Sequence, residues 1–171
     1  DGNRLYFLHS DYTAFGRYRY ELDERVRNGD LQPIFEIFNV FRTRTEERVA
    51  YAIEILAEEP NFTLDESFRF DRSELGWPTS EEELQEVWRK RVKNDGLSLV
   101  LTGKTWEETT ELLQTRYERV LRRVTQITSD DVFETFMNAL SHTMDPHSSY
   151  LSPRNSEEYR IQMSLSYDGI G

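Results

Sequence analysis

The sequence predicts an all-α protein, a mainly helical, bundle-like domain with a minor extended or β element and a C-terminal strand. Three observations predict this class. Apolar residues recur at steps of three and four along most of the 171 residues. Hydroxyl residues stand three positions before glutamates at the heads of two of these runs. The chain also contains 37% hydrophobic and 13% aromatic residues, which argues against a disordered chain.

The first helix is predicted over residues 11–28. Tyr12, Phe15 and Leu22 fall on one helical stripe, while the charged residues between them point elsewhere. Gly29 follows as a stop signal, since glycine is favoured just after the end of a helix. We therefore expect one amphipathic helix that ends at Gly29.

A second, longer helix is predicted over residues 31–59. Asp30 can cap its start, and Pro33 is tolerated because it lies in the first turn. Pro60 closes the segment. Since this run is longer than the usual helix, the sequence leaves room for a break near residues 42–45.

The pattern loosens at residues 62–71. Phe62, Leu64, Phe68 and Phe70 form a short alternating stretch, which is typical of a strand. Two interpretations stay open at this point. The stretch forms either a small β ribbon or an extended connector packed on the helices.

Two further helix starts are signalled by Ser80 with Glu83 and by Thr105 with Glu108. Each pair places a hydroxyl three residues before a carboxylate, the spacing of the reciprocal capping box. After Thr105 the apolar positions repeat at four and three, which predicts a helix packed against neighbouring helices.

A last long helix is predicted to begin with Thr128 or Ser129 as its cap. Its apolar residues lie on one face, and Asp145-Pro146 ends it. Residues 147–154 then form a turn-rich loop.

The end of the chain has a different pattern. Residues 155–162 are predicted to form a brief helix, and residues 163–171 alternate as a strand without a following partner. An unpaired alternating edge is a liability in a complete protein, so the chain is expected to be truncated. We accordingly divide it into a helical domain at residues 1–144 and a linker with a first strand at residues 145–171.

Charge and composition exclude several classes of partner and site. The formal net charge is -11, so the chain repels phosphate backbones, and nucleic acid is not an expected partner. No apolar run approaches the ~20 residues of a membrane span, and the start lacks the layout of a signal peptide. The chain has no cysteine, and we expect neither a metal site nor a cofactor site.

One compact cluster of chemically reactive residue types occurs near the end of the last long helix. It contains His142, Asp145 and His147, with Ser148 and Ser149 beside them. An autonomous hydrolase or metal-binding domain would use these residues. The two histidines, however, are five positions apart across a proline, whereas a helical zinc pair needs four. We therefore favour a hydrogen-bonded turn in which Asp145 and Ser148 bind backbone groups.

Several strings resemble those of carboxy-terminal processing peptidases. DPHSSYLSP at residues 145–153 is similar to the wider family, and IQMSLSYDGIG at residues 161–171 is closer to the long bacterial tail-specific proteases. YFLHSD at residues 6–11 and EIFN at residues 36–39 resemble the N-terminal helical domain of that branch. These matches bracket the whole chain.

The resemblance implies a periplasmic serine endopeptidase that grips nonpolar C-termini of protein substrates through a PDZ domain and cuts with a Ser/Lys dyad. It places the serine and lysine beyond Gly171, so no residue here inherits a catalytic role. This chain would be a non-catalytic scaffold or docking domain, with a lipoprotein adaptor as a further partner. The linker residues carried over as a structural element are Asp145, Pro146, His147, Ser149, Tyr150 and Leu151. The alternatives are a stand-alone helical interaction module and the hydrolase that uses His142, Asp145 and His147.

Overall fold

The computed structural model describes residues 1–164, and these residues are helical with long connectors. They separate into two compact units, Asp1–Gln126 and a second unit that begins at Ile127, which we call unit 1 and unit 2. The helices are α1 (His9–Phe15), η1 (Gly16–Tyr18), α2 (Leu22–Arg27), α3 (Gln32–Glu54), η2 (Ile55–Ala57), α4 (Glu81–Val100), α5 (Trp106–Thr125), α6 (Ser129–Met144) and α7 (Pro153–Ser164).

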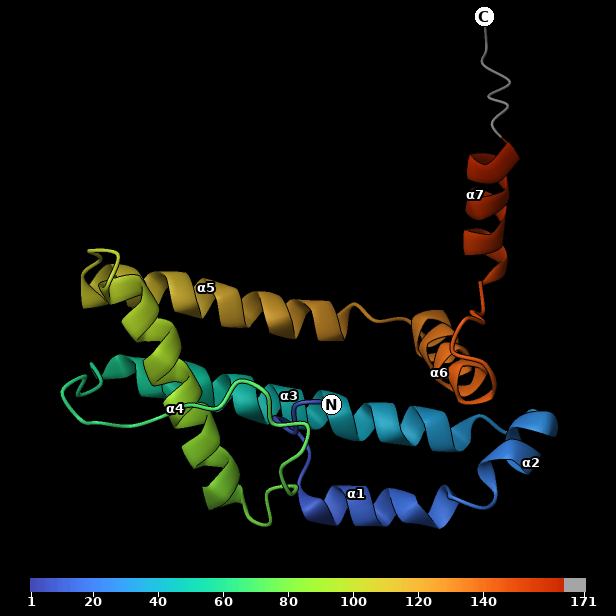
Figure 1. Cartoon of the computed structure of the whole chain (residues 1–171), viewed down its shortest axis with the longest axis horizontal. Coiled ribbons are helices and arrows are strands. Elements are labelled where there is room, and N and C mark those ends of the chain that lie inside the picture. The colour runs from blue at the N-terminus through green and yellow to red at the C-terminus, as the bar shows by residue number, and fades with distance from the viewer. Residues whose placement is uncertain (165–171) are drawn as a thin grey trace, which may run out of the picture. The chain divides into compact units, whose positions relative to one another are not determined.

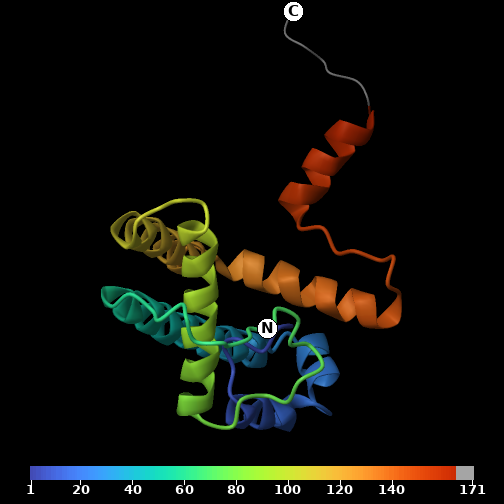
Figure 2. The ribbon, with the colours of Figure 1, turned by 60° about the vertical axis from the view of Figure 1, so that its left-hand side comes forward.

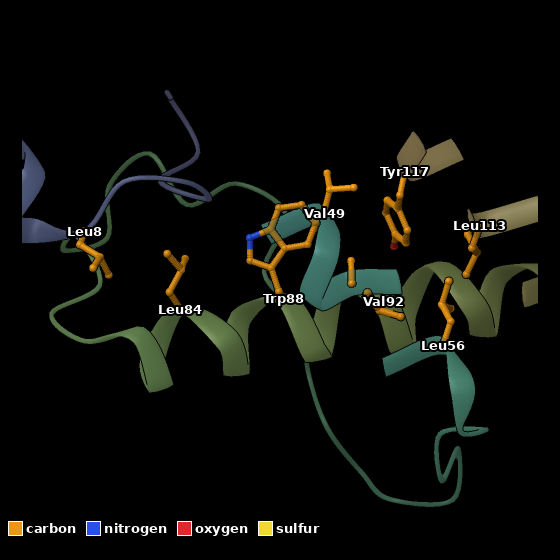
Figure 3. Packing of buried hydrophobic residues seen from close by; sticks show 9 residues of the cluster. Leu8, Val49, Leu56, Leu84, Trp88, Val92, Leu113 and Tyr117 are labelled. Carbon is orange, nitrogen blue, oxygen red and sulfur yellow. The ribbon is translucent and has the colours of Figure 1, made fainter. Parts of the chain in front are cut away.

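Unit 1 is built on three long helices. α3 and α5 lie alongside each other, and α4 crosses both of them (Figures 1 and 2). Their contact surfaces are apolar because each helix carries buried residues at helical spacing, and Figure 3 shows these side chains meeting in one cluster. The labelled residues come from the N-terminal segment (Leu8), α3 (Val49), η2 (Leu56), α4 (Leu84, Trp88, Val92) and α5 (Leu113, Tyr117).

Trp88 ties the start of the chain to this core. Its side chain is 1% exposed, and its indole Nε1 donates a hydrogen bond of 2.6 Å to the carbonyl oxygen of Leu5. The Tyr6 ring packs edge-on against both Trp88 and Phe41, with centroids 5.7 and 5.3 Å apart. The N-terminal segment is therefore part of the core of unit 1.

A close contact between α4 and α5 explains a glycine inside a helix. Gly96 lies in α4 and is buried, and a Cβ built at this position would lie 2.9 Å from Cζ3 of Trp106. Glycine normally weakens a helix interior. Here its missing side chain leaves the room that the indole of Trp106 occupies.

The predicted helix over residues 11–28 is divided in the structure. α1, η1 and α2 replace it, with a turn between η1 and α2. The Tyr18 hydroxyl donates to Glu36 of α3, and the Arg17 guanidinium donates to the same carboxylate, so tertiary contacts hold η1 away from an ideal helix. The stop at Gly29 is confirmed, since this residue has a positive φ of 77°.

The second predicted helix is present as α3 and η2. Asp30 helps at its start because its Oδ1 accepts from the backbone N–H of Gln32 at 3.1 Å. α3 continues through residues 42–45 without a break. Thr45 lies within it, fully buried, and its Oγ1 donates to the carbonyl oxygen of Phe41 at 2.8 Å, a local bond that an α-helix accommodates.

The predicted β element is absent from residues 1–164. Residues 62–71 form a connector without strand pairing. Side-chain contacts hold it instead: Phe62 packs on Trp106 with centroids 6.1 Å apart, and the ammonium group of Lys93 donates to the carbonyl oxygen of Leu64 at 3.2 Å. The β ribbon was therefore wrong, and the alternative of an extended connector describes this segment.

The predicted C-terminal strand is not supported either. The brief helix expected at residues 155–162 is longer, since α7 runs from Pro153 to Ser164 and so includes Met163, where the strand was expected to begin. Residues 165–171, which carry the rest of that prediction, lie outside the described residues. Among the helices of residues 1–164, none is both long and apolar enough to cross a membrane.

Candidate functional site

The predicted linker motif lies between α6 and α7, inside unit 2. Side chains of α6 hold it in place, and this helix is itself defined at both ends. The Thr128 Oγ1 accepts from the backbone N–H of Asp131 at 3.3 Å, and the Asp131 carboxylate accepts from the backbone N–H of Thr128 at 2.8 Å. This is the reciprocal capping box that fixes the first turn of a helix. At the other end Asp145 is extended, with φ -150° and ψ 118°, because a residue before proline avoids the helical region.

Asp145 organises a tight turn directly after α6. One carboxylate oxygen accepts from the backbone N–H of His147 at 3.0 Å, and the other accepts from the Ser148 hydroxyl at 2.9 Å. The Ser148 backbone N–H also donates to the Asp145 carbonyl oxygen at 3.0 Å. The backbone N–H of His147, and next the Ser148 hydroxyl, lower the pKa of Asp145, since both bonds favour the ionised carboxylate.

The α6–α7 connector, residues 145–152, then folds back onto α6. The backbone N–H of Tyr150 donates to Oδ1 of Asn138 at 2.9 Å, and the Asn138 amide donates to the carbonyl oxygen of Glu134 at 3.0 Å. The Tyr150 ring packs edge-on against Phe133, with centroids 5.6 Å apart. Asn138 therefore joins the connector to the helix through both ends of its amide group.

Glu134 of α6 holds the start of α7 through hydrogen bonds from Asn155. Both of its carboxylate oxygens accept from the Asn155 amide, at 2.8 and 3.0 Å. Ser152 supplies the cap, since its Oγ accepts from the backbone N–H of Asn155 at 3.3 Å and its carbonyl oxygen accepts from that of Ser156 at 2.8 Å. Two α6 side chains, four residues apart, thus hold the second half of the connector and the start of α7.

The sequence alone did not identify Glu134 and Asn138 as partners of the linker. A signal was present, because both are polar residues one helical turn apart within the apolar stretch of α6. What the sequence could not show is that the connector returns to this turn of the helix.

The remaining residues of the linker motif are mostly exposed. Pro146, His147, Ser149 and Leu151 all face solvent at least in part, and Leu151 is 40% exposed. Met144, at the end of α6, is 83% exposed. The structure thus presents an ordered turn whose outer surface is available for contact.

The geometry gives no support to the hydrolase alternative. The Ser148 hydroxyl donates to Asp145 rather than to an imidazole, and within residues 1–164 no hydrogen bond joins the ring of His142 or His147 to a serine. A nucleophilic serine needs such a base within hydrogen-bond reach. No group of three or more His, Asp or Glu side chains suited to a metal ion occurs in the described part of the chain.

Comparison with known proteins identifies the class of domain. The family model described as "Tail specific protease N-terminal domain" matches residues 1–154, which include unit 1, α6 and the whole connector. The chain belongs to this family, as the resemblance predicted. It is 37% identical over 172 aligned residues to the Tail-specific protease of Haemophilus influenzae, and the match covers 100% of this chain and 25% of that protein. The chain thus spans about a quarter of the length of this curated relative.

Proposed function

We propose that this chain is the non-catalytic N-terminal scaffold and docking domain of a tail-specific protease. One observation carries the proposal: similarity to a tail-specific protease extends over the whole chain but over only a quarter of the relative. The helical core of unit 1 supports a scaffold role because it is closed by apolar packing and leaves the outer helix faces free for contact.

The linker motif has a structural role in this proposal. Asp145, Ser148 and Tyr150 engage in hydrogen bonds that define the path of the chain between α6 and α7. A fixed path limits the directions in which a following domain can sit, which is useful when a substrate must pass from one domain to another. Asp145, Pro146, His147, Ser149, Tyr150 and Leu151 act here as a positioning element rather than as reacting groups.

The activity, substrates and location of the whole protein belong to the same proposal. We infer a serine-type endopeptidase of the periplasm, with a PDZ domain that recognises nonpolar C-termini and a lipoprotein adaptor as a docking partner. The support is the family resemblance of the sequence together with the membership established above.

A cleavage assay tests this function. The chain and a version extended through the domains that follow in the relative are compared on a peptide with a nonpolar C-terminus, each with and without chelator. We expect cleavage by the extended protein only. Adding this chain in trans to the following domains then shows whether it contributes to turnover of a folded substrate.

The contrary result is equally specific. Cleavage by the chain itself, lost on His147→Ala or on Ser149→Ala, would place an active site in the turn after α6. His9→Ala serves as the control, since His9 lies in α1 of unit 1 and outside the linker motif. An equal loss in this control would point to a general effect of the substitutions instead.

A further inference from the structure

A pocket of about 440 Å³ lies in unit 1 between the connector that precedes α4 and the first half of α4 itself. Three apolar side chains and two arginines form much of its lining: Phe68, Leu75, Val87, Arg69 and Arg72. Its volume falls within the range of small-ligand pockets. Apolar walls next to guanidinium groups suit a group that is charged at one end and apolar along its stem.

Arg72 is a half-buried cation, and it forms no ion pair within residues 1–164. Its Nε atom is buried without any hydrogen-bond partner in this part of the chain. Burial lowers the pKa of Arg72, the charge of Glu83 opposes this shift, and the guanidinium groups of Arg69 and Arg4 add to the lowering. A buried N–H group without a hydrogen-bond acceptor costs free energy, so an anion that accepts from this guanidinium would stabilise the site.

The acidic residues of the pocket are engaged elsewhere. The Glu83 carboxylate accepts from the backbone N–H and the hydroxyl of Thr79, at 2.8 and 3.0 Å. The Glu86 carboxylate accepts from Nε and Nη2 of Arg89, at 2.7 and 2.8 Å. Neither carboxylate forms a direct hydrogen bond with Arg72, although the charge of Glu83 acts on it from a distance.

The charge balance selects the kind of anion. Three cationic and two anionic side chains line the pocket, Lys90 being the third cation, so its net charge is +1. A singly charged carboxylate matches this balance, whereas a doubly charged phosphate would leave the pocket with an excess of negative charge. Arginine also presents a planar fork that a carboxylate can accept with both oxygens.

The open mouth of the pocket indicates how such a group is presented. Ser67, Arg69 and Gly76 at its edge are exposed, and a Cβ on Gly76 would meet no atom within 4 Å. A polypeptide can therefore run past the opening while one side chain enters. The methylene groups of an Asp or Glu side chain would then cross the apolar wall to reach Arg72.

We propose that this pocket of unit 1 binds a single acidic side chain, Asp or Glu flanked by apolar residues, from a partner protein, with Arg72 as the residue that pairs with its carboxylate. The inference deepens the proposed docking role and rests on it, because it names one contact through which the domain would hold another protein.

The test uses the whole chain and short labelled peptides blocked at both ends. One peptide carries a single Glu between leucines, and its matched control carries Gln at that position. Fluorescence polarisation is expected to show about tenfold tighter binding of the Glu peptide, a difference of about 1.4 kcal/mol. Arg72→Gln is expected to remove this preference, and added salt to weaken it.

A control variant separates the pocket from general charge effects. Arg116 of α5 is exposed and forms no ion pair in the described residues, so Arg116→Gln changes the net charge equally and should leave binding unchanged. The thermal midpoint of each variant verifies folding. The comparison of Glu with Gln peptides on the unchanged chain needs no variant at all.

Three outcomes would overturn the inference. The first is equal binding of the Glu and Gln peptides, and the second is an equal loss in Arg72→Gln and Arg116→Gln. The third is that the Gln peptide with a free C-terminus binds more tightly than the blocked Glu peptide, which would assign the site to a terminal carboxylate. Each of these leaves the cleavage experiment unaffected, so failure of this pocket and failure of the proposed function remain distinct results.

Discussion

Each of the two units of this chain is stabilised internally by a different kind of interaction. In unit 1 the N-terminal segment and three long helices close an apolar core around Trp88, Leu84 and Leu113. In the described part of unit 2, Val132 is the one apolar residue that is buried, and the connector is held by hydrogen bonds to α6. A net hydrogen bond contributes about 0.5–1.5 kcal/mol, less than a buried aromatic side chain. Unit 2 should therefore open locally while unit 1 stays folded.

The largest expected effect comes from the core of unit 1. Trp88→Ala removes a side chain that is 1% exposed and leaves the Leu5 carbonyl oxygen without its donor. We expect the free energy of unfolding to fall by about 3–5 kcal/mol, measured by urea denaturation. Tyr20 is 84% exposed, so Tyr20→Ala should change the free energy of unfolding by less than about 0.5 kcal/mol. Similar losses in both variants would contradict this description of the core.

A smaller effect is expected where α4 meets α5. In Gly96→Ala the added Cβ would lie 2.9 Å from the Trp106 ring, so the ring must shift. Overpacking costs about 1–3 kcal/mol, and the gain of about 0.5–1 kcal/mol from replacing a helical glycine offsets part of it. We expect a net loss in thermal stability.

Gly16→Ala is the matched control for this contact. Gly16 has φ -55°, and a Cβ there would meet no atom within 4 Å. Alanine should therefore stabilise the chain by about 0.4–1 kcal/mol. A stabilising Gly96→Ala would show that α4 and α5 are less tightly packed than this structure describes.

The next effect is a pH dependence of stability that arises from the ion pairs of Glu66 with Arg89 and Lys93 in unit 1. Hydrogen bonds from Arg89 first, and then from Lys93, lower the pKa of Glu66 from 4.5 to about 2. A carboxyl group with a lowered folded pKa stabilises the fold above its unfolded pKa, and this contribution is lost as the pH falls from about 4.5 towards 2. Glu66→Gln should flatten the pH dependence of the unfolding midpoint in this range. An unchanged pH dependence in this variant would show that Glu66 does not form these ion pairs in the folded chain.

The smallest global effect is expected in unit 2. Asn138→Ala removes the acceptor for the Tyr150 backbone N–H. We expect faster hydrogen exchange at Tyr150 and its neighbours, with the free energy of global unfolding changed by less than about 0.5 kcal/mol. Ser149→Ala is the control because Ser149 is exposed. A global loss as large as that of Trp88→Ala would mean that unit 2 is integral to the core.

Local signals in the sequence were sufficient for the starts of α4, α5 and α6. The Thr105 and Glu108 pair forms the expected reciprocal cap, with bonds of 2.9 and 3.2 Å, and Thr128 was one of two residues expected to cap α6. Such caps involve residues three positions apart, so their geometry follows from nearby sequence. The Ser80 cap is present too, although Glu83 turns to Thr79 instead of closing the box.

Long-range contacts decided what the sequence did not predict. The turn that divides residues 11–28 depends on Glu36 of α3, and the linker depends on Glu134 and Asn138. The alternation at residues 62–71 suggested a ribbon, but Phe62 packs on Trp106 of α5, Phe68 and Phe70 pack on each other, and no strand within residues 1–164 pairs with them. Period-two spacing by itself cannot distinguish these outcomes.

The hydrogen bond from Trp88 to Leu5 joins residues 83 positions apart and has a consequence for biosynthesis. A ribosome adds ~5–20 residues per second, so Leu5 waits about 4–17 s for Trp88 to be made. Leu8, buried in the finished core, has no complete packing surface during that interval. Residues 5–8 therefore remain an exposed apolar segment during this interval, which is when a chaperone would meet them.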